Sequence, residues 1–117
     1  MIPCQINLYI LVHNKTNWKY EIVSLSDNNI VIPSIDINSN DSIIDLLKKL
    51  FEQCVDFDSF FANFILSDVT NKDKLIIHYY CLMHYSIVTK LKKVYLHSIN
   101  TTNEIFIPAI NKILSKI

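Results

Sequence analysis

The stretch "IPSIDINSNDSIIDLLKKLFEQ", from Ile32 to Gln53, contains the strongest structural signal in the chain. An extended run ends at Pro33, a loop rich in Asn, Asp and Ser follows, and an amphipathic segment begins near Ser42. Proline ends strands because it lacks a backbone N–H, whereas Asn, Asp and Ser favour turns. The stretch therefore predicts a strand end, a polar loop and a helix, an arrangement that several phosphate- and metal-handling sites share.

We expect this helix to run from about Ser42 to Cys54, with the side chain of Asn40 or Asp41 capping its first amide groups. Because successive side chains lie about 100° apart around a helix axis, the apolar and polar residues separate onto two faces. The predicted buried face contains Ile43, Ile44, Leu46, Leu47, Leu50, Phe51 and Cys54. The predicted solvent face contains Ser42, Asp45, Lys48, Lys49, Glu52 and Gln53.

The remainder of the chain predicts a sheet and a second helix. Runs of β-forming residues between Asn- and Asp-containing turns indicate strands over residues 6–13, 18–25, 30–32, 57–66, 74–85 and 93–99. The first two strands, and also the fourth and fifth, are expected to form antiparallel hairpins. A closing helix is expected over residues 104–117, with a buried stripe of Ile107, Ile110, Ile113, Leu114 and Ile117. The order β-β-β-α-β-β-β-α indicates one α+β domain over residues 1–117, in which a mixed sheet is sandwiched between helices.

The composition narrows the classes of function. Half of the 117 residues are hydrophobic, which is enough for a compact core. The formal net charge is zero and all eleven basic residues are lysine, so neither long-range attraction nor arginine forks favour nucleic acid as a partner. The sequence has no glycine, which excludes a glycine-rich phosphate-binding loop.

Cysteine usage and the N-terminus indicate a cytoplasmic protein. Cys4, Cys54 and Cys81 are scattered without a CxxC pair and are expected to be reduced thiols. The first residues lack the features of a signal peptide, and no apolar run approaches membrane-spanning length. The abundance of Ile, Asn, Lys, Tyr and Phe resembles the output of an AT-rich genome, such as that of a phage, an endosymbiont or an organelle. If a phage encodes the chain, it is a candidate component of the virion and not of the cytoplasm.

The predicted element order, with a polar loop leading into the first helix, resembles the Nudix hydrolase fold. In that family the loop and helix after the third strand contain Gly, five residues, Glu, seven residues and then Arg-Glu-apolar-any-Glu-Glu-any-Gly-apolar. The resemblance implies a helix whose glutamates bind Mg²⁺ and activate water to split a diphosphate that is bound to another group.

Two registers place this sequence on the family pattern, and neither retains a glycine. In the first register, Asp41 and Ser42 match a Glu-Ser pair of the family, and Lys49 matches the arginine. Leu50 then occupies the position of the first helix glutamate, and Gln53 occupies the first position of the glutamate pair. This register retains no metal-binding glutamate.

In the second register, Lys48 matches the arginine, Lys49 stands at the first helix glutamate, and Leu50 keeps the apolar position. Glu52 and Gln53 then match the glutamate pair, so one metal ligand of three is retained. Magnesium is usually held by several carboxylates, and a lysine at a ligand position adds repulsion. Asp36 and Asp41, in the loop before the helix, are the remaining candidates for oxygen ligands of Mg²⁺ or Mn²⁺.

The segment "HYYCLMH" raises a second candidate for metal binding or nucleophilic chemistry. On a strand, His78 and His84 share one face, about 20 Å apart, and Cys81 faces the other way, so the three cannot hold one zinc ion. We interpret them as residues of the sheet. Several aromatic residues could form a protein-binding surface, though core positions are the commoner use: Trp18, Tyr79, Tyr80, Tyr85 and Tyr95.

Two hypotheses follow. The first is a Nudix-like pseudoenzyme without catalytic residues or a cofactor, which acts as a binding or assembly module through a protein partner or self-association. The alternative is a divergent phosphohydrolase of nucleoside-diphosphate compounds that depends on Mg²⁺ or Mn²⁺ and uses Glu52 with Asp36 or Asp41.

Overall fold

The computed structural model describes residues 3–14, 19–38, 40–56, 62–70, 74–83, 89–99 and 107–116. The elements follow the predicted order: β1 (Cys4–Asn14), β2 (Lys19–Ser24), β3 (Ser34–Ile37), α1 (Ile43–Cys54), β4 (Asn63–Thr70), β5 (Lys74–Met83), β6 (Tyr95–Ser98) and α2 (Ile107–Lys116). The predicted α+β class, with a mixed sheet and two helices, is confirmed.

Strand β1 is the centre of the sheet, whose order is β4-β5-β1-β2-β6 with β3 also paired to β1. On one side, β1 runs parallel to β5 along most of its length. On its other side, the first half of β1 pairs with β3 and the second half pairs with β2, both antiparallel. The β1–β2 and β4–β5 pairs are antiparallel, so both predicted hairpins are confirmed.

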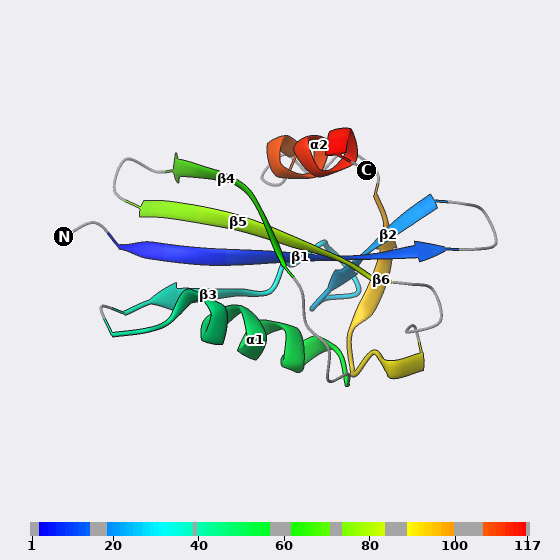
Figure 1. Cartoon of the computed structure of the whole chain (residues 1–117). Helices are drawn as coiled ribbons and strands as arrows, with labels where there is room; N and C mark the ends of the chain where they lie inside the picture. Colours follow the sequence, from blue (N-terminus) through cyan, green and yellow to red (C-terminus); the bar gives the residue numbers. More distant parts are fainter. Residues whose placement is uncertain are drawn as a thin grey trace.

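Alternation along β1 divides the core into two layers on opposite faces of the sheet. Ile6, Leu8 and Ile10 join the cluster that α1 covers, whereas Tyr9 and Leu11 join the cluster that α2 covers. Figure 1 shows the two helices on opposite sides of the sheet, with β3 beside α1. The helices therefore bury different side-chain sets of the same central strand.

The third strand lies later in the chain than expected. It begins at Ser34, after Pro33, whereas the sequence predicts a strand over residues 30–32. The buried Ser24 hydroxyl accepts the Val31 N–H at 2.8 Å, and the Val31 carbonyl accepts the Leu25 N–H at 2.9 Å. These bonds hold residues 24–31 as a closed loop, which the local pattern of β-forming residues does not reveal.

Another strand boundary also differs from the prediction. Strand β4 continues to Thr70, beyond the predicted end at residue 66, because it pairs with β5 as far as Lys74. The predicted strand residues 57–61 and 84–85 lie outside the described part of the chain. Cys54 and Cys81 are buried thiols outside any disulfide bond, as expected, and Cys4 is half-buried.

The burial of the two helices corrects part of the predicted apolar stripes. Ile44 of α1 is 69% exposed and Ile43 is 37% exposed, although both were expected in the core. In α2, Ile110 and Ile113 are buried as expected, but Leu114 is 39% exposed. The side chains of Ile107 and Ile117 lie outside the described set. In the part of the chain that the structure describes, no helix has the length and apolarity to cross a membrane.

Candidate functional site

The segment that leads into α1 forms a loop closed by two hydrogen bonds between Asn38 and Asp41. The Asp41 carboxylate accepts the Asn38 N–H at 3.0 Å, and the Asp41 N–H donates to the Asn38 carbonyl at 3.0 Å. Ser42 is the N-cap residue, its side chain makes no capping bond, and its carbonyl accepts the Leu46 N–H at 3.0 Å. The expectation that Asn40 or Asp41 is the cap is therefore wrong, because the Asp41 carboxylate is engaged within the loop.

The last turn of α1 is attached to a distant segment. The Lys92 ammonium donates to the Glu52 carbonyl at 2.5 Å, and the Lys92 N–H donates to the Cys54 carbonyl at 2.8 Å. A cation suits this position because the free carbonyls at a helix C-terminus carry partial negative charge. Both ends of α1 are thus held, so the direction of its solvent face is well defined.

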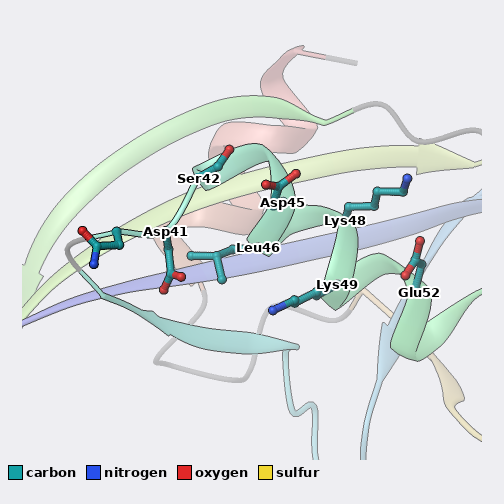
Figure 2. A pocket seen from close by; sticks show the side chains of 8 residues that line it. Asp41, Ser42, Asp45, Leu46, Lys48, Lys49 and Glu52 are labelled. Carbon is teal, nitrogen blue, oxygen red and sulfur yellow. The ribbon is translucent and has the colours of Figure 1, made fainter.

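A polar hollow of about 410 Å³ lies along this solvent face. Its lining comes from one continuous part of the chain: Asn40, Asp41, Ser42, Asp45, Leu46, Lys48, Lys49 and Glu52. Figure 2 shows that Lys48 and Lys49 leave the helix in different directions, and that Lys49 extends back toward the end that holds Asp41. The hollow therefore presents carboxylates and ammonium groups together along one face.

This arrangement does not fit the metal centre that the family resemblance implies. Within the described residues, no three His, Cys, Asp or Glu side chains are grouped so that they could hold a metal ion. Leu50, which stands at a family glutamate in the first register, is 0% exposed and belongs to the core. Lys49, which stands there in the second register, adds positive charge to the hollow. Gln53, an exposed amide, offers no charge to a divalent ion.

Asp36 lies on the other side of the sheet from α1. Its neighbours Ile35 and Ile37 pack against the cluster beneath α1, and strand alternation turns Asp36 to the opposite face. Asp36 forms a 3.4 Å ion pair with Lys74 and does not line the hollow. The structure therefore brings Asp41 and Glu52 to one hollow, together with Asp45, and keeps Asp36 apart from them.

A buried polar network crosses the sheet on the α2 side. The Gln5 amide donates to the Asn7 side-chain oxygen at 2.7 Å, and the Tyr9 hydroxyl lies 2.8 Å from Nδ1 of His78. Burial raises the pKa of the Tyr9 hydroxyl, while its side-chain hydrogen bond with Asn7 acts in the opposite direction. Of these residues, the sequence analysis singled out only His78. The alternation of Gln5, Asn7 and Tyr9 with apolar residues could have indicated that the three share one face of a strand.

The histidine and cysteine of β5 face opposite layers, as strand alternation predicts. His78 contacts Tyr9 on the α2 side, whereas Cys81 lies in the cluster under α1. Burial raises the pKa of Cys81 to about 12 and that of Cys54 to about 11, which keeps both thiols neutral near pH 7. Neither is an activated nucleophile. His84 lies outside the described residues.

No protein-family model matches the sequence, and a search of curated proteins finds no significant relative. Solved structures nevertheless match nearly the whole chain. A MutT/Nudix family protein from Listeria innocua superposes with a TM-score of 0.73 at 10% identity, covering 97% of this chain and 92% of that chain. The Ap4A hydrolase of C. elegans gives a TM-score of 0.68 at 7% identity, covering 99% of this chain and 98% of that chain.

A third structural neighbour was solved in a protein complex. It is the C-terminal domain of mouse MUTYH bound to human PCNA, with a TM-score of 0.71 at 5% identity, covering 99% of this chain and 89% of that chain. At such low identities the likeness concerns the fold alone. The chain has the Nudix fold, as its element order predicted.

Proposed function

We propose that this chain, which has the Nudix fold, is a binding or assembly module that acts through contact with protein and not through metal-dependent hydrolysis. The observation that carries this proposal is the side-chain set on the solvent face of α1. Two lysines lie among the carboxylates there, and Leu50 belongs to the core. Hydrolysis of a diphosphate needs concentrated positive charge from metal ions, which such a face does not gather.

Two further observations agree with contact to protein. Ile44 leaves a large aliphatic side chain 69% exposed on α1, beside charged groups of both signs. Mixed charges around an apolar centre resemble the rim and core of protein interfaces. The MUTYH domain, which shares the fold, was solved bound to the protein PCNA. One fold serves both enzymes and binding domains, so the residues of the site carry more weight than the fold.

The second candidate function is a divergent phosphohydrolase of nucleoside-diphosphate compounds. It is favoured by the likeness to an Ap4A hydrolase over nearly the whole chain, since the structural neighbours include enzymes. It is also favoured by Asp41, Asp45 and Glu52, which line one hollow. In this reading Glu52 and Asp41 would be the acidic groups of the site, and Asp36 would have no part because it lies on the other face.

A hydrolysis assay separates the two functions. The purified chain and its Glu52→Gln variant are incubated with Mg²⁺ or Mn²⁺ and a panel of dinucleoside polyphosphates, nucleotide sugars and nucleoside triphosphates. We expect the same background release of product from both proteins. Turnover by the unaltered chain that Glu52→Gln abolishes would establish the hydrolase and refute the binding module. Calorimetric titration with Mn²⁺ is a second readout, for which we expect no saturable heat below millimolar concentration.

A further inference from the structure

The solvent face of α1 carries charges in an order that is complementary to itself. From its N-terminal end, the face presents Asp41 and Asp45, then Lys48 and Lys49, and then Glu52. All of these side chains are exposed. A parallel copy of the helix would place like charges opposite each other. An antiparallel copy reverses the order and places the acidic first half against the basic centre.

We propose that α1 pairs with the same helix of a second copy of this chain, antiparallel, about a two-fold axis at the level of Leu47. The inference rests on the proposed function, because it names the partner of the binding module. A two-fold contact uses one patch twice, so each favourable pair occurs two times. Asp45 of one copy then lies opposite Lys49 of the other, and Ser42 lies opposite Glu52. At the ends, Asp41 meets the neutral amide of Gln53, so the acidic ends do not face each other.

The shape of this face also suits a second copy. The exposed apolar side chain of this face is that of Ile44 and not that of Leu46, which lines the hollow but is only 3% exposed. Ile44 lies beside the charged residues of this face and is the most exposed of the large hydrophobic residues in the described part of the chain. An antiparallel contact would reduce its exposure. Antiparallel helices also place the positive end of each helix dipole near the negative end of the other.

Sedimentation equilibrium of the full chain tests the pairing. We expect a concentration-dependent dimer whose dissociation constant rises at least about tenfold when the salt concentration rises from about 0.05 to 0.5 M, because exposed charges are screened. The variants Asp45→Lys and Lys49→Asp should each weaken the dimer at least about tenfold. Lys112→Asp makes the same change of charge on the exposed side of α2 and should leave the dimer unaltered.

An equimolar mixture of the Asp45→Lys and Lys49→Asp chains provides the decisive comparison. In the mixed pair, the lysine introduced at position 45 of one chain faces the aspartate introduced at position 49 of the other. The unaltered Lys49 of the first chain faces the unaltered Asp45 of the second. The mixture should therefore dimerise as tightly as the unaltered chain, although each variant alone does not. Far-UV circular dichroism confirms that both variants keep the fold.

Three outcomes would overturn the inference. The first is an unaltered chain that remains monomeric up to about 1 mM, where even weak interfaces associate. The second is a dimer that neither charge reversal weakens, which places the interface elsewhere. The third is a mixture that fails to recover, which excludes the antiparallel register. None of these outcomes depends on hydrolytic activity, so the inference can fail while the proposed function stands.

Discussion

The hydroxyl of Tyr9 provides a sharp test of the buried polar network. Tyr9 is 0% exposed and His78 is 7% exposed, and their side chains meet at 2.8 Å. Tyr9→Phe removes one oxygen and leaves the ring in place. The variant therefore deprives both His78 and Asn7 of a buried hydrogen-bond partner without opening a large cavity.

The expected cost follows from that lost partner. A buried polar group without its hydrogen bond destabilises a protein by about 1–3 kcal/mol, so Tyr9→Phe should lower the free energy of unfolding by this amount. In the variant Tyr9→Phe/His78→Leu both partners are apolar. The double variant should be less destabilised than the sum of the two single variants, by roughly 0.5–3 kcal/mol.

Urea unfolding followed by circular dichroism measures these values at one protein concentration. Tyr95→Phe is the control, because Tyr95 is 47% exposed and loss of its hydroxyl should change stability by less than about 0.5 kcal/mol. If Tyr9→Phe is as stable as this control, or if the two single effects simply add, the hydrogen bond between Tyr9 and His78 does not hold the network together.

Three further predictions concern the core, the thiols and the exposed ion pair. Leu50→Ala should lower the free energy of unfolding in urea by about 3–5 kcal/mol, because Leu50 is 0% exposed. The control Gln53→Ala, on the solvent face of α1, should lower it by less than about 0.5 kcal/mol. Equal effects would mean that Leu50 does not lie on the buried face of α1. Burial raises the pKa of Cys54 to about 11 and that of Cys81 to about 12, whereas thiols in the unfolded chain ionise near pH 9, so the free energy of unfolding should fall as the pH rises from about 9 toward 12. The variant Cys54→Ala/Cys81→Ala should show a shallower fall with pH. An identical slope would contradict the burial of the two thiols. Asp36→Asn should lower the free energy of unfolding by less than about 1 kcal/mol, because the Asp36–Lys74 ion pair is largely exposed. In any enzyme assay the variant should leave activity unchanged. Loss of turnover would instead show that Asp36 belongs to the active site.

The candidate site was predictable in part. The position of α1 and its solvent face followed from periodicity, because a helix repeats every few residues whatever it packs against. Asp41 and Glu52 were therefore recognised as residues of one helix face and its loop, and the structure places both at the hollow. Asp45, on the same face, was not proposed as an acidic residue of the site. The role of Asp41 in closing the loop depends on the Asn38 backbone, which no local pattern specifies.

The sequence by itself determined the order of elements, the α+β class and the buried face of α1 from Leu46 to Cys54. These features depend on local periodicity and on turn-forming residues, which act over a few positions. The sequence could not show that Ile44 is exposed, because the reach of the sheet beneath α1 is set by strands from other parts of the chain. Only the tertiary structure decided the remaining features. The parallel pairing of β1 with β5 brings Asn7 opposite His78 and so brings Tyr9 to His78, 69 residues away, while the pairing of β3 with β1 turns Asp36 away from α1. Such contacts depend on strand register between distant segments, and register follows from the packing of the whole sheet.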